Sequence, residues 1–499
     1  MRGFIYPLVV VLLAGCMVGP DYRRPTVDVP RAFQYQVSEA RETGNTLWWK
    51  QFDDPVLDDL IAEALVNSKN VQIAAATIEQ AQGVLTQTRA PLFPQLNYTG
   101  TGTRERASEM GATSIASVPN PQTSYQLLAG ANWELDLWGK VRRQTEAARA
   151  NLFASEEARR GVILSLVASV AASYLQLVGL DEQLVIANRT LETYAESVKL
   201  FELQFKHGQV SQMNVAQARS QYETAAATIP QLESQIAQTE IALSILLGRN
   251  PGPIKRGKSI FTLSPPAIPA GLPSQVLERR PDIAQAEQNL VAANAQIGAA
   301  KALYFPTISL TGTLGTSSSE LENLFKGPAR VWSYAGSITG PIFNAGLIAG
   351  QVKQAEAGRK IALLSYESAI QNAFGDVEKA LVSCEKLVDQ LKAQGLLVEA
   401  LKEYAQLARL QYQGGYVTYL TVLDAEQQLF PAELNYASTR SSLLASYVKL
   451  YQAMGGGWVV EAEKLTSETQ PAAVPPFPIT PQPEVALQPA AAPTTATVP

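Results

Sequence analysis

The sequence predicts a mixed α and β membrane protein in which pairs of transmembrane-length strands alternate with very long helices. Three observations predict this fold class: an internal repeat, two pairs of strand-like segments, and apolar heptads that run too far for a globular domain. The four strands of one chain cannot close a barrel, and lipid tolerates no open sheet edge, because each unpaired backbone group there costs several kcal/mol. We therefore expect copies of the chain to close the barrel.

Closure by copies leaves two arrangements. Three chains give a twelve-stranded transmembrane β-barrel, which agrees with the even strand numbers of bacterial barrels. Their long helices then continue the cylinder below the membrane. Two chains give eight strands, and side chains would fill the lumen of that barrel. The trimer is our prediction, and the dimer is its physical alternative.

The internal repeat consists of segments that return in the same order. Residues 93–101 (FPQLNYTGT) return at 305–313 (FPTISLTGT), and residues 205–210 (FKHGQV) return at 412–417 (YQGGYV). Both offsets are about 210 residues, which is typical of a duplicated unit. Each half is therefore predicted to contain a helix, two strands, a very long helix, a Gly turn and a last helix.

Each half carries two predicted strands. Residues 95–106 and 123–136 surround a loop rich in Ser, Ala, Pro and Gly, and residues 306–317 and 330–343 surround a polar loop. These lengths suit tilted transmembrane strands of about 9–11 residues with short flanks. Aromatic residues lie in or beside the strands, where an interfacial girdle is expected, although any sheet is rich in them: Tyr125, Trp133, Trp138, Trp332 and Tyr334.

The helices of each half differ in length. A helix is predicted over 56–90, where Pro91 and Pro94 stop it. Helices over 139–207 and 345–413 would each be about 100 Å long at 1.5 Å per residue. Apolar residues recur every seven positions along both, which forms a coiled-coil seam: Leu184, Leu191, Val198 and Phe205 with Ala187, Tyr194 and Phe201, then Val377, Cys384, Leu391, Val398, Ala405 and Tyr412 with Ala380, Leu387, Gln394, Leu401 and Ala408.

The N-terminal residues predict an export signal. Arg2 precedes a short apolar stretch, and residues 13–16 (LAGC) resemble the bacterial lipobox, in which the cysteine becomes the lipidated first residue. We therefore predict acylation of Cys16 and anchorage in membrane lipid. Met17 follows in place of the aspartate that retains many lipoproteins at the inner membrane, so the expected location is the outer membrane.

Composition excludes several classes of function. A net charge of −5 gives no basic footprint for nucleic acid. One histidine, His207, and one cysteine left after acylation, Cys384, offer no metal site, no disulfide and no nucleophile–base set. We therefore expect no enzyme activity, no catalytic residue, no metal and no cofactor. No apolar run after residue 13 is expected to reach the length of a transmembrane helix.

The chain is predicted to divide into six parts. The division follows the export signal, the repeat, and the composition of the linker and of the tail, neither of which can bury a core. The parts are a signal peptide (1–15), a lipidated N-terminal segment (16–55), a first repeat (56–250), a Pro-rich linker (251–273), a second repeat (274–460) and a disordered tail rich in Pro and Ala (461–499).

Six short motifs resemble one known family. They are residues 16–22 (CMVGPDY), 47–52 (LWWKQF), 133–139 (WELDLWG), 277–283 (LERRPDI), 305–306 (FP) and 453–458 (AMGGGW). Together they resemble the outer-membrane efflux proteins, specifically the NodT-type lipoprotein channels of resistance-nodulation-division multidrug pumps. The resemblance covers residues 16 to 460.

The resemblance implies an assembly and a function. It implies a homotrimer with a twelve-stranded β-barrel, a periplasmic α-helical barrel and a coiled-coil tip that is closed at rest. An inner-membrane pump of the same class and a periplasmic adaptor protein would dock beneath it. The expected function is passive conduction of drugs or other small toxic compounds to the cell exterior.

The resemblance also points to a gate and a docking tip. Residues 420–425 (LTVLDA) resemble the family's aperture segment, which makes Asp424 the gate carboxylate and Leu420 the apolar constriction. Three copies of Asp424 around one axis would repel, so the closure can be released; the plainer alternative is a solvated aspartate. Gly208, Gly414 and Gly415 mark the hairpin tips, read either as adaptor-docking sites or as simple tight turns.

Several charged motifs, and the function itself, allow alternative interpretations. Arg280 looks like part of a phosphate grip, but Pro281 and Asp282 suit the start of a helix better. Glu134 and Asp136 suggest an acid–base pair, but a strand end explains them more simply. The exit duct of a type I protein secretion system shares the expected architecture, and a lipid-anchored coiled-coil scaffold that conducts nothing is a different class.

Overall fold

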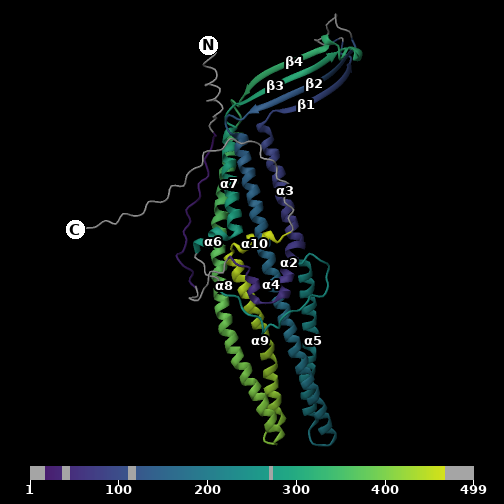
Figure 1. The fold of residues 1–499 in the computed structure, drawn as a ribbon, viewed down its shortest axis with the longest axis vertical. Helices are drawn as coiled ribbons and strands as arrows, with labels where there is room; N and C mark the ends of the chain where they lie inside the picture. Colours follow the sequence, from purple (N-terminus) through teal and green to yellow (C-terminus); the bar gives the residue numbers. More distant parts are fainter. Residues whose placement is uncertain (1–16, 36–44, 109, 111–119, 269–272, 467–499) are drawn as a thin grey trace, which may run out of the picture. The chain divides into compact units, whose positions relative to one another are not determined.

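The computed structural model describes residues 17–35, 45–108, 110, 120–268 and 273–466 (Figure 1). The predicted acylation site Cys16 and the signal peptide lie outside the described residues, as does the tail after residue 466. The helices and strands of the described residues form one compact unit.

The strands of both halves form a single antiparallel sheet. They are β1 (Gln95–Glu105), β2 (Gln122–Leu135), β3 (Thr307–Ser318) and β4 (Arg330–Thr339), in the order β1-β2-β3-β4 (Figure 1). The two hairpins join where β2 pairs with β3, for example Ala129 opposite Leu314. Within the described sheet, β1 and β4 each keep one unpaired edge.

The predicted strand boundaries are right to within one residue, except at the end of β4. The predicted segment 330–343 pairs only as far as Thr339. Gly340 and Pro341 follow, and a proline has no N–H to donate to a ladder. The strand therefore stops four residues early.

The sheet has two chemically different faces. Directly opposite residues share a face, so the register assigns each side chain. The apolar face carries Leu96, Tyr98, Leu127, Ala129, Ala131, Trp133, Ile308, Leu310, Leu314, Trp332, Tyr334 and Ile338. The polar face carries Asn97, Thr99, Thr101, Thr103, Ser124, Gln126, Asn132, Ser309, Thr311, Thr313, Ser333 and Ser337. This division is the pattern of a membrane strand with lipid on one side and water on the other.

The helices repeat the duplication seen in the sequence. The long helices α4 (Lys140–Lys206) and α8 (Leu347–Gln413) both have 67 residues. The helices that return from them, α5 (Gln212–Leu246) and α9 (Tyr419–Met454), have 35 and 36 residues. Both returning helices contain an internal proline, Pro230 in α5 and Pro431 in α9. The predicted internal repeat is therefore confirmed.

The remaining elements complete each half. The predicted helix 56–90 is two helices, α2 (Pro55–Asn67) and α3 (Lys69–Arg89), because Ser68 takes the extended value ψ 125° between them. The shorter elements are η1 (Trp48–Phe52), η2 (Ala90–Leu92), α6 (Pro273–Arg279), α7 (Pro281–Ala302), η3 (Leu321–Asn323), η4 (Gly327–Ala329) and α10 (Trp458–Lys464). Helix α10 extends past residue 460, where the tail was predicted to begin.

The long helices pack side by side, with α4 between α5 and α9, and α9 between α4 and α8 (Figure 1). The predicted heptad seam lies inside these contacts. Every predicted seam residue is buried or half-buried apart from Phe205, which lies in the last turn before a hairpin tip. The helical pairs are therefore held together largely by the residues that the heptads identified.

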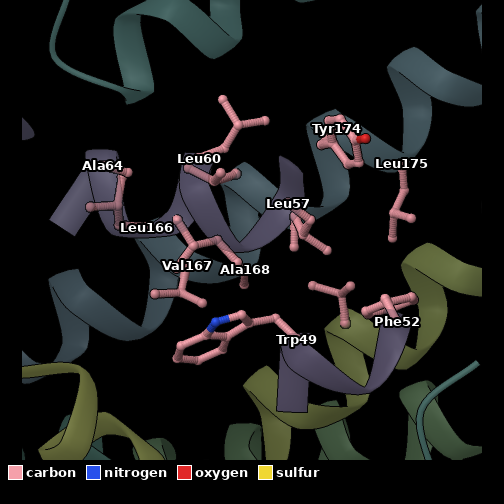
Figure 2. Close-up of a cluster of buried hydrophobic side chains, with 14 of the residues drawn as sticks. Trp49, Phe52, Leu57, Leu60, Ala64, Leu166, Val167, Ala168, Tyr174 and Leu175 are labelled. Carbon is pink, nitrogen blue, oxygen red and sulfur yellow. The ribbon is translucent and has the colours of Figure 1, made fainter. Parts of the chain in front are cut away.

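A core of large apolar side chains lies midway along the helices (Figure 2). Trp49 and Phe52 of η1 and Leu57 of α2 pack against Val167 and Tyr174 of α4. Helix α4 contains an 18-residue stretch of mean hydropathy 1.9, long and apolar enough to cross a membrane, so the expectation that no such run exists is wrong. That stretch is 61% buried within the protein, and contact with α2, α9 and α10 accounts for its apolar character.

The N-terminal segment lies along the helices. The guanidinium of Arg143, which is almost fully buried, donates to the carbonyl oxygens of Val18 and Gly19 at 3.3 Å and to Asp21 Oδ1 at 2.7 Å. Farther along, the hydroxyl of Tyr22 donates to Glu287 Oε1 at 3.0 Å. These bonds fix the start of the described chain to α4 and α7.

Candidate functional site

The two hairpin tips are tight turns of the same kind, in which Gly208 and Gly415 occupy equivalent positions. Gly208 has φ +72° and Gly415 has φ +75°, in the left-handed region that favours glycine. Gly414 has φ −76°, which any residue can adopt. The structure therefore explains Gly208 and Gly415 by turn geometry alone, and a docking role for the three glycines stays a prediction.

The predicted gate residues lie in the first turns of α9, directly after the second tip. Asp424 is exposed and accepts two hydrogen bonds, from the hydroxyl of Tyr404 at 3.1 Å and from Gln428 Nε2 at 2.9 Å. Leu420 is also exposed, one helical turn nearer the tip. Thr421, between them, is half-buried. Within one chain Asp424 is thus oriented by two neutral donors and has no cationic partner among the described residues.

A buried carboxylate lies two residues beyond Asp424. Glu426 is 5% exposed and accepts a hydrogen bond from Arg409 Nε of α8 at 2.7 Å. Its other oxygen, Oε2, has no partner among the described residues. Burial raises the pKa of Glu426, and the nearby Arg409 guanidinium opposes that rise. The hydroxyl of Tyr194 in α4 donates to the backbone oxygen of Glu426 at 3.1 Å.

A second buried carboxylate lies two turns farther along α9. Glu433 accepts from Arg189 Nη2 of α4 at 2.6 Å and from Lys402 Nζ of α8 at 3.1 Å. The Lys402 contact lies within the α8–α9 hairpin, whereas the Arg189 contact joins that hairpin to α4. Glu426 and Glu433, with Tyr194, Arg189, Lys402 and Arg409, are called the tip clasp below.

The tip clasp lines a groove of about 450 Å³ between α4, α8 and α9. Its walls carry three cations and the two buried carboxylates, so the charges balance nearly within the groove. The contacts of Arg189 and Tyr194 connect α4 to α9 on this face. The arrangement can hold the α8–α9 hairpin against α4 close to the predicted gate, and it can release when those polar contacts break.

The apolar heptads of the sequence do not reveal the tip clasp. A signal was present: Lys402 and Arg409 are seven residues apart on α8, and Glu426 and Glu433 are seven apart on α9. Charged residues at heptad spacing on two antiparallel helices indicate a polar layer across their interface. We considered only the apolar heptads and therefore missed it.

The other candidate residues have structural roles. Arg280 is buried and donates to the carbonyl oxygen of Ala453 at 2.9 Å and to Asp282 Oδ2 at 2.8 Å. Asp136 accepts from the backbone N–H groups of Val141 and Arg142 at the start of α4. Glu134 pairs with Lys140 at 2.6 Å. No group of ligands that could hold a metal ion occurs among the described residues.

An amphipathic sheet with two unpaired edges, joined to four long helices that end in a polar clasp, defines one subunit of a channel that crosses a membrane. The model of the family "Outer membrane efflux protein" matches residues 60–249 and 272–456, one match for each half of the internal repeat. The chain belongs to this family of outer-membrane efflux proteins.

Individual relatives agree with this membership. The cation efflux system protein CusC of Escherichia coli O6:H1 is 38% identical over 456 residues, which cover 90% of this chain and 97% of CusC. The antibiotic efflux pump outer membrane protein ArpC of Pseudomonas putida is 37% identical, over 90% of this chain and 94% of ArpC. The open-state structure of the Neisseria gonorrhoeae MtrE outer membrane channel superimposes with a TM-score of 0.80 at 34% identity, over 89% of this chain and 99% of MtrE. The predicted family, outer-membrane location and efflux-channel function are confirmed.

Proposed function

We propose that three copies of this chain form a passive exit duct, anchored in the outer membrane through Cys16, for an efflux pump. The observation that carries the proposal is the two-faced sheet whose outer strands β1 and β4 each leave an edge unpaired. Neighbouring copies pair these edges, so that the apolar face meets lipid and the polar face lines the lumen. The duct catalyses no reaction, and the pump supplies the driving force.

The proposed gate is formed at the helical tips. Around the three-fold axis, three copies of Asp424 and of Leu420 face one another and narrow the lumen. The hydrogen bonds from Tyr404 and Gln428 hold each carboxylate in place. Like charges at close range repel, so the closed ring is stable only while the tip clasp holds the helices together.

The proposed partners are a periplasmic adaptor protein and an inner-membrane pump. The tips around Gly208, Gly414 and Gly415 are the ends of the α4–α5 and α8–α9 hairpins, and they expose apolar side chains such as Tyr416. An adaptor that binds these ends is positioned to pull the two hairpins apart. The pump delivers its cargo into the lumen above the opened tip.

The proposed cargo is small and toxic, and the relatives favour two classes: cations, by similarity to CusC, and antibiotics, by similarity to ArpC. The polar face of the sheet carries hydroxyl and amide side chains along most of its length, a surface that does not discriminate strongly by charge. We favour drugs and similar organic compounds, because no group of His, Cys, Asp and Glu side chains that could hold a metal ion occurs among the described residues. The whole sequence has only two cysteines and five methionines, the residues that soft metal ions prefer.

The test is the susceptibility of a deletion strain to panels of antibiotics, dyes, detergents and metal salts. Loss of the protein should lower the tolerated concentration of several organic compounds, and a plasmid copy should restore it. A strain that became sensitive only to metal salts would reassign the cargo. Unchanged susceptibility to all of the compounds would refute the proposed role in exporting them.

A further inference from the structure

Two arginines lie on the apolar face of the sheet at its hairpin end. Arg104 is opposite Thr123 near the end of β1, and Arg330 is opposite Thr316 at the start of β4. The register places both on the face that carries Tyr98, Leu127 and Trp332. In the proposed duct this face meets lipid, and the hairpin end is the end away from the periplasmic helices (Figure 1).

Neither charge is compensated by the residues that the structure describes. Both side chains are exposed, and neither guanidinium has a hydrogen-bond or ion-pair partner among the described residues. The described strands place no carboxylate on the apolar face, because Glu105 and Glu134 both lie on the polar face. A cation at a membrane surface without a counter-charge from the protein is suited to an anionic lipid headgroup.

Closure of the barrel brings the two positions together. Arg104 lies on the edge strand β1 and Arg330 on the edge strand β4, each within one residue of the strand end. When β1 of one copy pairs with β4 of the next, the strands are about 4.8 Å apart and their hairpin ends lie side by side. Each junction between β1 of one copy and β4 of the next therefore carries two like charges on its lipid side, which repel unless an anion lies between them.

Aromatic side chains mark the depth of this site in the membrane. Trp332 and Tyr334 follow Arg330 on the same face, stacked with their ring centroids 5.7 Å apart, and both are exposed. Trp and Tyr at such positions lie at the boundary between headgroups and acyl chains. Trp332 is two residues from Arg330, or about 7 Å along the strand, so the guanidinium reaches the headgroup layer.

We propose that each junction between neighbouring copies binds an anionic, phosphate-bearing lipid of the outer leaflet. The guanidinium groups of Arg104 and of Arg330 from the neighbouring copy hold the phosphate, because arginine donates in a planar fork that matches phosphate oxygens. Trp332 and Tyr334 lie against the first part of the acyl chains. The inference rests on the proposed trimer, since one chain supplies only half of each site.

The test compares purified protein in vesicles of phosphatidylcholine with protein in vesicles that also contain lipid A, a diphosphorylated glycolipid. The variant Arg104→Gln/Arg330→Gln removes both cations. The matched control Lys199→Gln/Lys392→Gln removes two exposed cations from α4 and α8, outside the membrane, which have no ion-pair partner among the described residues. Lipid A retained by each protein is measured by mass spectrometry, and trimer content and single-channel conductance are recorded on the same samples.

The wild-type protein and the control should retain lipid A, whereas the double arginine variant should bind it about 30-fold more weakly. Each basic residue contributes about 1 kcal/mol to binding an anionic lipid. The loss of two such residues therefore gives this factor, because every 1.4 kcal/mol changes the dissociation constant about tenfold. Inorganic phosphate added to the vesicles that contain lipid A should not displace it, because the acyl chains contribute to binding. Equal retention by variant and wild type, or full competition by phosphate, overturns the lipid site while conducting trimers keep the proposed function intact. Absence of trimers from the wild-type sample overturns both.

Discussion

Replacing Arg189 by glutamine should weaken the contact that holds the α8–α9 hairpin against α4. Arg189 Nη2 lies 2.6 Å from Glu433 Oε2, and the two side chains are 59% and 7% exposed. Because Arg189 is exposed, the pair resembles an ion pair at the protein surface, which contributes up to about 1 kcal/mol to stability. After the substitution Lys402 still neutralises Glu433, so no uncompensated charge remains buried.

Three copies multiply this effect. If the three clasps release together, the closed state loses about 3 kcal/mol relative to the open state, which is a roughly 150-fold change in their ratio. The assay is the open probability of single channels in planar bilayers. We expect Arg189→Gln to open more often than the wild type at the same unit conductance.

A matched control lies in the other hairpin. Arg219 of α5 pairs with Glu202 of α4 at 2.7 Å, so this contact stays within one hairpin. The variant Arg219→Gln should leave the open probability unchanged. A double-mutant cycle with Glu433→Gln then isolates the pair, because Arg189→Gln should have little further effect once the carboxylate is gone. Equal effects of Arg189→Gln in both backgrounds would refute the clasp.

Three further predictions concern the gate, its pH dependence and the N-terminal segment. The variant Asp424→Ala should raise the single-channel conductance, and an unchanged conductance would count against Asp424 as the gate. Burial raises the pKa of Glu426 in the folded protein above its value in the unfolded chain. The protonated carboxyl therefore stabilises the fold fully below the ordinary glutamate pKa of about 4.3, and this stabilisation is lost as the pH rises through the pKa of the folded protein. Thermal unfolding should therefore show Glu426→Gln gaining stability relative to the wild type between acidic and neutral pH; a constant difference would contradict this. The variant Arg143→Met should release residues 17–35 to limited proteolysis and destabilise the fold by about 2 kcal/mol, whereas exposed Arg149→Met should match the wild type.

Periodic features of the fold could be predicted from the sequence because one face of each element is buried. The heptads of α4 and α8 identified seam residues such as Ala187, Phe201 and Val398, and all three are buried. Alternating strands flanked by turn residues gave the boundaries of β1, β2 and β3 to within one residue. Local chemistry was sufficient at each of these places.

Contacts between distant segments could not be predicted in this way. Arg189 and Glu433 are 244 residues apart, and nothing local to either one indicates the other. The extended segment that Arg143 holds has no periodicity, so its path along α4 and α7 depends on single hydrogen bonds. The apolar stretch of α4 likewise depends on its neighbours. Other elements pack against it on several sides, so it lacks the polar face that a surface helix keeps.

The most direct test of the proposed duct is a disulfide across the seam between copies. Thr101→Cys in β1 is combined in turn with Val331→Cys, Ser333→Cys or Ala335→Cys in β4, all of which lie on the polar face. Oxidation in the outer membrane should give a covalent three-chain species for the pair that lies opposite in register, since opposed side chains approach to about 5 Å. The control Thr101→Cys with Tyr334→Cys, on opposite faces, should stay monomeric on a denaturing gel. A largest species of two chains, or no crosslink at any of the three positions, would contradict the trimeric barrel.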